Sequence, residues 1–411
     1  LLGRGVPDTP IFSQMLARVR RARREAQRHE VVLFLSGGDE HTGTVLDELV
    51  GWTPDEFAID PSYAVYSEAG VDAGALGNHE LDRGGAVLAR GIRTNARFPI
   101  LSANIHGSEF VTAGSDYFPA AIGIAKGLRI GLIGLTTTVD TRTRTSIDPD
   151  LVAARPVAVL HNLLPAVARL ADIVVVLSHC GYGDDGSSLG KAGSYRHLEE
   201  GDLPLARAIA AISDKPVVIV GGHTHTQLNA DGLDASTLID GIPIVQAGGL
   251  GTHIGELEAT VVAGRRRAVE VQARLHVLKR GGATGPASGR PIPGEDYDAA
   301  FEAGTVAPIL ARVDRLMQEP IAEIDADASV LPETTKVARY TGECALANFI
   351  SDAVVARSRE FPGGAVDLAI TNATAVGDGI PASGALSFGQ WYSVMPFADT
   401  LQVGQLSHAE L

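Results

Sequence analysis

Apolar runs recur along the first two-thirds of the chain, and most of them break into Gly, Ser or Thr followed by a polar residue. Runs of this length and composition predict buried β-strands. Three of them, FPILSAN, LRIGLIGLTT and IPIVQAGG, have no chemically distinctive end. Four others end in side chains that bind metals or transfer protons: VVLFLSGGD at Asp39, VDAGALGNHE at Asn78 and His79, DIVVVLSHC at His179, and PVVIVGGHTH at His223 and His225.

Helical patterns lie between several of these runs. The segments IFSQMLARVRRARREAQ, VAVLHNLLPAVARLA and LPLARAIAAI space their apolar residues three and four positions apart. Continuous apolar strands that alternate with amphipathic helices predict a sheet covered on both faces, and therefore an α/β fold. In such sheets the ligand site forms beyond the carboxyl ends of the strands, so Asp39 is expected where a buried strand reaches a cleft. The two glycines before Asp39 let the backbone turn tightly there.

The character of the sequence changes after about residue 275. The segment LKRGGATGPASGRPIPGEDY is rich in Gly and Pro, which indicates an exposed connection, and VAPILARVDRLMQ then predicts a helix. A second unit follows, with a helix expected in CALANFISDAVVARSRE and a strand in VDLAIT. We therefore expect a first domain over residues 1–275, a connection with a helix over 276–320, and a smaller domain over 321–411.

Composition and charge limit the function classes. A net charge of −15 argues against binding to nucleic acid polymers or anionic membrane surfaces, and an anionic substrate would need a local cation. No apolar run approaches the roughly 20 residues of a membrane-spanning helix. Cys180 and Cys344 form no CxxC pattern, so two buried free thiols are favoured over a disulfide between them. The sequence carries no signal for an oligomeric state.

The four polar strand ends together offer one carboxylate, one amide and three imidazoles when His79 is left aside. Such oxygen and nitrogen donors suit Zn, Mn, Fe or Co rather than Ca. Asp39 could bridge two ions, and His223 and His225 would face the same side if the strand continued through them. Two ions about 3.5–4 Å apart would activate a shared water as hydroxide and neutralise a phosphoryl group.

Each of these features has an ordinary explanation when it is taken alone. An Asp after Gly-Gly is usually a turn residue, a single His such as His179 is usually a hydrogen-bonded buried side chain, and short His pairs are common. The coincidence of all four at successive strand ends favours a metal site.

The ordered motifs Gly38-Asp39, GNHE, Ser178-His179 and GHTH resemble those of the calcineurin-like metallophosphatases. Within that superfamily, LGNHELDRG, LSHCGYGDD and IPIVQAGGLGTHIGELE look like the 5'-nucleotidase family, and TGECALANFISDAV and YSVMPFADTLQV look like its C-terminal domain. The resemblance implies a four-layer α/β/β/α metallophosphatase domain followed by a smaller α/β substrate domain, which this chain carries incompletely.

The resemblance also implies roles for individual residues. Asp39 would bridge two divalent metal ions, His225 would serve one of them, and the other would take Asn78, His179 and His223. His79 would face the scissile phosphate, oriented by Asp82; the alternative for His79 is a purely structural role. Asn372 would contribute to substrate binding.

Two departures from the family pattern stand out. The family's first motif, Asp-x-His at the end of a central strand, is absent, and the loss of that strand would open the core, so we expect an upstream segment that carries it. The alternative is a degraded site with one metal. The family's Gly-Gly and Arg after the position of Asn372 are also absent, and its base-binding aromatic residues would lie beyond Leu411.

The leading prediction is a two-metal 5'-nucleotidase that releases phosphate and nucleoside through attack of a metal-bound hydroxide. A phosphodiesterase or nucleoside-diphosphate-sugar hydrolase on the same centre, a thiosulfate-type ester hydrolase, and a noncatalytic binding protein with a degraded metal site are the alternatives. The expected partner is a small phosphorylated substrate, which the resemblance implies to be a nucleotide. The resemblance alone implies a periplasmic or secreted location.

Overall fold

The computed structural model describes residues 10–41, 44–138, 148–183, 198, 200–262, 270–278, 297–360, 364–396, 401 and 403–407. The chain divides into two compact units, with the main division between Pro308 and Ile309. Unit 1 precedes this division and unit 2 follows it. The predicted domain limits, 1–275 and 321–411, stay a prediction, and much of the expected Gly/Pro-rich connection lies outside the described residues.

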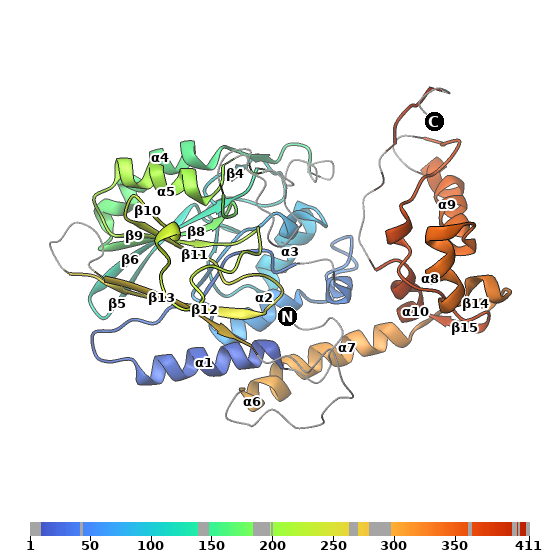
Figure 1. Ribbon diagram of the computed structural model, residues 1–411, viewed down its shortest axis with the longest axis horizontal. Helices are drawn as coiled ribbons and strands as arrows, with labels where there is room; N and C mark the ends of the chain where they lie inside the picture. Colours follow the sequence, from blue (N-terminus) through green and yellow to red (C-terminus); the bar gives the residue numbers. More distant parts are fainter. Residues whose placement is uncertain are drawn as a thin grey trace. The chain divides into compact units, whose positions relative to one another are not determined.

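Two β-sheets form the centre of unit 1 (Figure 1). The smaller sheet is parallel and has the order β1-β2-β3, with β1 (Leu35–Ser36), β2 (Ala73–Ala75) and β3 (Ile100–Leu101). The larger sheet has the order β10-β11-β9-β8-β6-β5, with parallel inner strands and an antiparallel strand at each edge. Its strands are β5 (Ala120–Ala125), β6 (Leu128–Thr136), β8 (Ile173–His179), β9 (Val217–Gly221), β10 (Leu238–Ile239) and β11 (Ile242–Val245).

Helices cover the outer faces of both sheets. The smaller sheet is covered by α2 (Pro61–Ala69) and α3 (Gly85–Asn95), and the larger sheet by α4 (Pro156–Leu170) and α5 (Asp202–Ile212). Three buried apolar clusters hold these layers together. Examples from the three are Leu88 with Ile100 on the smaller sheet, Leu164 with Val176 on the larger sheet, and Ala75 with Val175 between the sheets. This order of layers confirms the predicted α/β/β/α architecture.

The remaining elements of unit 1 lie around this sandwich. Helix α1 (Ile11–Glu25) contributes Phe12, whose ring stacks on Tyr66 of α2 with centroids 5.2 Å apart. Two antiparallel pairs are formed by β4 (Ile105–His106) with β7 (Val152–Ala153), and by β12 (His253–Thr260) with β13 (Glu270–Val277). Helix α6 (Ala299–Phe301) is followed by a π-helical turn, Glu302–Val306, and then by α7 (Ala307–Gln318), most of which belongs to unit 2.

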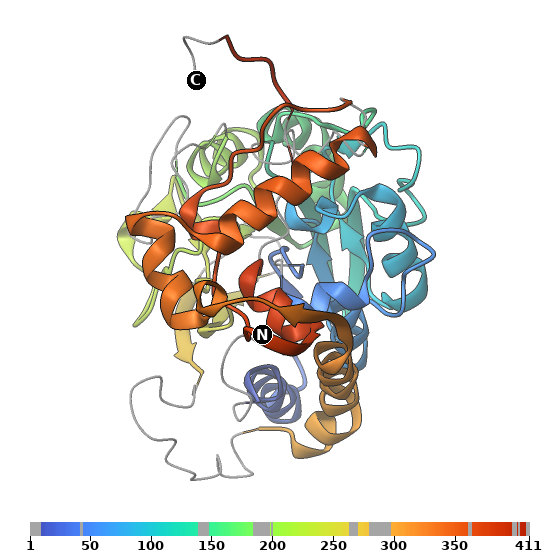
Figure 2. The same cartoon turned by 90° about the vertical axis from the view of Figure 1, so that its right-hand side faces the viewer.

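Unit 2 contains α8 (Pro332–Thr341), α9 (Ala345–Arg357) and α10 (Phe388–Val394), and an antiparallel pair of β14 (Pro320–Asp325) with β15 (Ser383–Ser387). Figure 2 shows α8 and α9 in orange. The core of unit 2 includes Leu346, Ile350 and Val376. Within the described residues of the whole chain, no helix combines the length and apolar character needed to cross a bilayer.

The predicted elements agree with the structure in most places. Helices occur where the periodicity predicts them, at α1, α4, α5, α7 and α9, and both cysteines are buried and free, as expected. The strand predicted in VDLAIT is wrong, because residues 366–371 form no strand. A strand needs a ladder partner, and among the described residues of unit 2 the two paired strands, β14 and β15, pair with each other. Ile370 is consequently 77% exposed.

The close approach of the two sheets depends on Gly134 of β6. A Cβ atom at this position would lie 2.2 Å from the main-chain oxygen of Leu101 on β3. We expect Gly134→Ala to lower the free energy of unfolding by about 3 kcal/mol, because neither backbone can move aside within the packed core. The matched control is Gly123→Ala on β5, where the nearest atom would be 4.0 Å away and a change within about 1 kcal/mol is expected. Equal denaturation midpoints for the two variants would contradict this account.

Candidate metal centre

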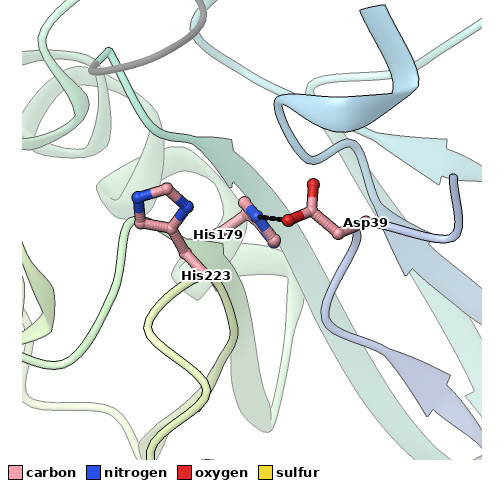
Figure 3. Close-up of side chains that lie close together, drawn as sticks. All are labelled: Asp39, His179 and His223. Atoms are coloured by element: carbon pink, nitrogen blue, oxygen red, sulfur yellow. Dashed lines mark ion pairs between the residues drawn. The ribbon is translucent and has the colours of Figure 1, made fainter. Parts of the chain in front are cut away.

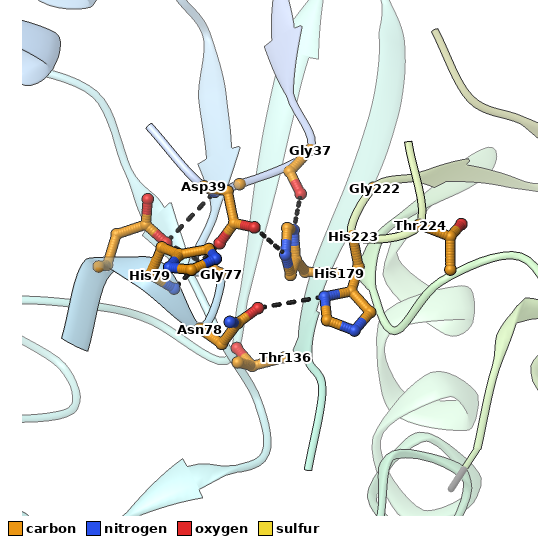
Figure 4. A network of polar contacts seen from close by, with 12 residues as sticks. Gly37, Asp39, Gly77, Asn78, His79, Thr136, His179, Gly222, His223 and Thr224 are labelled. Atoms are coloured by element: carbon orange, nitrogen blue, oxygen red, sulfur yellow. Dashed lines mark hydrogen bonds and ion pairs between the residues drawn. The ribbon is translucent and has the colours of Figure 1, made fainter. Parts of the chain in front are cut away.

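The parallel strands bring the predicted ligands to one edge of the sandwich (Figure 4). Asp39 lies three residues beyond β1, and Asn78 lies three residues beyond β2. His179 is the last residue of β8, and His223 follows β9 by two residues. Since Ser178 pairs in register with Gly221, the ends of β8 and β9 lie side by side. The topology therefore joins donors that are as much as 184 positions apart in the sequence (223 − 39).

Three of these side chains form a compact cluster (Figure 3). One potential ligand atom from each of Asp39, His179 and His223 lies within 4.8 Å of the others. The Nδ1 atom of His179 donates to the main-chain oxygen of Gly37 at 2.6 Å, and its Nε2 atom faces Asp39 Oδ2 at 2.9 Å. Among the described residues, neither of these two facing atoms has a hydrogen-bond partner. A divalent cation would satisfy both buried atoms, so the donor set fits a metal ion.

The charges in the cluster match this interpretation. Burial alone would raise the pKa of Asp39, but the positive charge that the nearby His179 can carry holds it well below its usual range. Burial alone would lower the pKa of His179, but the Asp39 carboxylate opposes this effect and raises it. Burial and the nearby His179 lower the pKa of His223 to about 3. Asp39 is therefore an anionic donor, and His223 is the neutral imidazole that metals bind.

Asn78 lies beside His223 at the base of the cluster. Its Oδ1 atom accepts a hydrogen bond from His223 Nδ1 at 3.1 Å, and both residues are at most 1% exposed. The amide thus fixes the orientation of the ring as well as offering an oxygen donor.

His225 occupies a different backbone conformation from the one predicted. Strand β9 ends at Gly221, and His223 and His225 have left-handed φ values of 68° and 54°. The condition under which both rings would face the same side, an extended strand through both residues, is not met, because the chain turns immediately after β9. The pKa of His225 is lowered by burial, which favours its neutral form.

His79 lies next to the cluster with its ring partly exposed. Its Nδ1 atom contacts Asp82 Oδ2 at 2.8 Å, and its side chain is 26% exposed; the orienting role of Asp82 stays a prediction. The main-chain N–H of His79 donates to Asp39 Oδ1 at 3.0 Å. One oxygen of the Asp39 carboxylate thus ties the loop after β2 to the loop after β1.

Glu80 supports the centre and was not singled out from the sequence. Its carboxylate is 2% exposed and accepts main-chain N–H groups from Gly77 and Glu40, each at 2.6 Å, and from Asp39 at 3.3 Å. These bonds stabilise the turn in which Asp39 has a left-handed φ of 60°. The signal available in the sequence was the position of Glu80 itself, an acidic residue inside the LGNHELDRG motif, where the basic residues nearby are His79 and Arg83 of the same motif.

A buried ion pair anchors the same loop. His41 Nε2 lies 2.9 Å from Asp60 Oδ2, and the two residues are 8% and 0% exposed. Burial would lower the pKa of His41, but Asp60 overcomes this effect and raises it to about 10. Asp60 also accepts the main-chain N–H of Tyr63 at the start of α2. The ligand loop is therefore fixed to a helix of the outer layer.

Asn372, predicted to bind substrate, lies in unit 2. Its Oδ1 atom accepts the main-chain N–H of Ala375 at 2.9 Å and the hydroxyl of Thr374. These bonds form a local turn, and the substrate role of Asn372 stays a prediction. The upstream Asp-x-His segment also stays a prediction.

Comparison with known proteins places these observations in a family context. Residues 320–411 match the family model described as 5'-nucleotidase, C-terminal domain. The chain is 26% identical over 429 residues to a snake venom 5'-nucleotidase of Crotalus adamanteus, a match that covers 97% of this chain and 64% of that protein. It is 29% identical over 256 residues to protein UshA of Escherichia coli (strain K12), covering 59% of this chain and 43% of that protein. The chain thus spans less than two-thirds of the length of either relative.

A solved structure extends the comparison over nearly the whole chain. The 5'-nucleotidase precursor from Thermus thermophilus matches with a TM-score of 0.59 and 26% sequence identity, covering 97% of this chain and 70% of that one.

The stability of unit 1 is expected to depend on pH through Asp202, the first residue of α5, which contacts Ser178 near the end of β8. Asp202 is fully buried, accepts the hydroxyl of Ser178 at 2.5 Å, and has its pKa raised to about 7 by burial. The folded state holds this proton up to about pH 7 and the unfolded state only to about 3.8, so stability falls as the pH rises through this window. We expect Asp202→Asn to raise the free energy of unfolding by roughly 2–4 kcal/mol at pH 8, and less at pH 5.

The measurement is urea denaturation of both proteins from pH 5 to 8. Asp234→Asn is the control, because Asp234 is an exposed capping residue that accepts the main-chain N–H of Ser236, and this change should stabilise at no pH. A less stable Asp202→Asn protein at pH 8 would show that the ionised carboxylate is not the source of the effect.

Proposed function

Because the chain resembles 5'-nucleotidases over nearly its whole length and its residues 320–411 match a 5'-nucleotidase C-terminal domain, we propose that it hydrolyses phosphate esters and acts as a 5'-nucleotidase, releasing phosphate and a nucleoside. The observation that carries this proposal is the convergence of Asp39, His179 and His223 at the ends of separate strands. Their two facing, buried atoms fit a cation better than they fit each other. The similar proteins support the reaction class, and the cluster provides side chains that could hold a metal ion for this reaction.

Two divalent ions are proposed at this centre. Asp39 would contact both ions, Asn78, His179 and His223 would hold one, and His225 would serve the other. Zn, Mn, Fe and Co are all compatible with these nitrogen and oxygen donors. When bound, such ions supply charge neutralisation for the phosphoryl group and lower the pKa of the hydrolytic water.

The protein's own side chains are assigned the positioning and proton transfer. The Asp39 carboxylate stays ionised because its pKa is held low, so it neutralises bound cations across the pH range of catalysis. Asp82 orients His79 through Nδ1, and we assign the Nε2 atom of His79 to stabilise the phosphoryl group or to protonate the leaving oxygen. The 26% exposure of the His79 side chain gives a substrate access to it.

The proposed substrates are nucleoside 5'-monophosphates. This choice is supported by the 5'-nucleotidase activity for which the Crotalus and Thermus relatives are named and by the match of residues 320–411 to a 5'-nucleotidase C-terminal domain. A location in the periplasm or outside the cell is also proposed, and the venom source of one relative supports it.

The test is the release of phosphate from AMP by the purified protein with Mn²⁺, Zn²⁺ or Co²⁺ added. We expect His79→Ala to lower kcat by about 10²- to 10⁴-fold while bound metal is retained, because it removes proton transfer and not a ligand. Asp39→Ala should lose both the metal and the activity. Metal content is measured on the same samples by atomic emission.

His276→Ala serves as the control, because this histidine lies on β13 and pairs with Glu256. It should leave metal content and turnover unchanged. An unchanged rate for His79→Ala would refute its assigned role. Faster cleavage of a nucleotide sugar or a phosphodiester than of AMP would refute the 5'-nucleotidase assignment while leaving the metal-dependent hydrolase in place.

A further inference from the structure

The loop after β9 holds two candidate ligands in an unfavourable conformation. His223 and His225 both have left-handed φ values, which non-glycine residues adopt at an energetic cost. Such a conformation persists only where surrounding contacts impose it. The side chains that impose it therefore decide where the two imidazoles point.

Gln246 makes these contacts from the neighbouring strand. It directly follows β11, which runs parallel to β9 with Val245 opposite Val220, and its side chain is buried with 2% exposure. Its Nε2 atom donates to the main-chain oxygen of Gly222 at 2.6 Å. Its Oε1 atom accepts the hydroxyl of Thr224 at 3.1 Å and the main-chain N–H of Thr226. One amide thus contacts the residues before, between and after the two histidines.

We propose that Gln246 is a positioning residue of the metal centre, which fixes His223 and His225 in their metal-binding conformations without contacting the metal. This inference rests on the proposed function. The amide suits this role because its NH₂ group faces the main-chain oxygen of Gly222, while its oxygen faces the hydroxyl of Thr224 and the main-chain N–H of Thr226. A single orientation of the amide therefore satisfies all three groups.

The contacts of Gly222 explain why this anchor affects the whole cluster. A Cβ atom at Gly222 would lie 2.6 Å from the main-chain oxygen of Gly37 and 2.9 Å from His179 Nδ1. The backbone that Gln246 holds is therefore packed against the hydrogen bond that orients His179. A shift of Gly222 would change the separation between the rings of His179 and His223, whose centroids are 5.2 Å apart.

Thr224 extends the same network toward the loop after β8. Its hydroxyl oxygen accepts the main-chain N–H of Tyr182 at 3.0 Å while the hydroxyl donates to Gln246. Gln246 is thereby connected to the loop that carries His223 and His225 and to the loop that directly follows His179.

Asn229 provides a matched control within the same part of unit 1. It is also a buried amide, 6% exposed, with a left-handed φ of 61°. Its Nδ2 atom donates to the main-chain oxygen of Ile244 at 2.8 Å, and its Oδ1 atom accepts from Asp234 and Thr237. The loop that Asn229 organises contains none of the proposed ligands.

The experiment compares Gln246→Met with Asn229→Leu, since each replaces a buried amide by a hydrocarbon-like side chain of similar size. Co²⁺ alone is titrated into each protein, and its visible absorption reports both affinity and coordination geometry. We expect Gln246→Met to weaken Co²⁺ binding by about 10- to 100-fold and to alter the band shape. Asn229→Leu should lose comparable thermal stability but keep the Co²⁺ affinity within about threefold and the spectrum unchanged.

A second pair of variants serves as a control for misfolding. Gln246→Glu and Asn229→Asp each turn a donor that faces a main-chain carbonyl into an acceptor, while keeping the shape of the side chain. An added negative charge by itself would strengthen cation binding, so weaker Co²⁺ binding by Gln246→Glu alone would support displacement of the loop. Asn229→Asp should bind Co²⁺ with the same affinity as the unsubstituted protein.

Equal Co²⁺ affinities and spectra for the Gln246 and Asn229 variants would overturn the positioning role and leave the proposed function intact. Failure of the unsubstituted protein to bind Co²⁺ would overturn both. A Gln246→Met protein that binds normally but hydrolyses AMP slowly would also refute the inference, because positioning of the ligands must act through the metal.

Discussion

The candidate centre depends on backbone turns that begin where buried parallel strands end. Asp39, His223 and His225 all have left-handed φ values, at a cost of roughly 1–2 kcal/mol each. Buried side chains hold these turns through main-chain hydrogen bonds, with Glu80 on the smaller sheet and Gln246 on the larger one. The sheets are consequently a rigid support, and three of the residues whose side chains must converge lie in strained turns just beyond them.

Electrostatics gives the centre its preference for cations. The chain carries a net charge of −15, and Asp39, Glu80 and Asp60 bring carboxylates into the interior around the ligand loops. Each carboxylate has a different compensation: main-chain N–H groups for Glu80, a histidine for Asp60, and a facing imidazole for Asp39. The pairing at Asp39 leaves two buried acceptor atoms without hydrogen bonds among the described residues, so this is the place where a metal ion would be most strongly stabilised.

Substrate recognition rests on different evidence from catalysis. The proposed chemistry is argued from contacts within unit 1, whereas the match to a 5'-nucleotidase C-terminal domain covers residues 320–411. In unit 2, Asn372 is engaged in its own turn, and Arg339 donates to the main-chain oxygens of Val376 and Gly377. The contacts described in unit 2 are therefore local ones, and the proposed substrate rests on the comparisons.

The sequence by itself determined the layered α/β architecture and most helices, and it singled out the candidate donors, because apolar periodicity and residue type are local properties. It could not determine the backbone after β9, since His223 and His225 are turned by contacts with Gln246, which is 21 positions beyond His225 (246 − 225). It also predicted a strand at residues 366–371, where the described part of unit 2 offers no ladder partner. Only the tertiary structure decided these features, because hydrogen-bond partners and burial depend on residues that are distant in the chain.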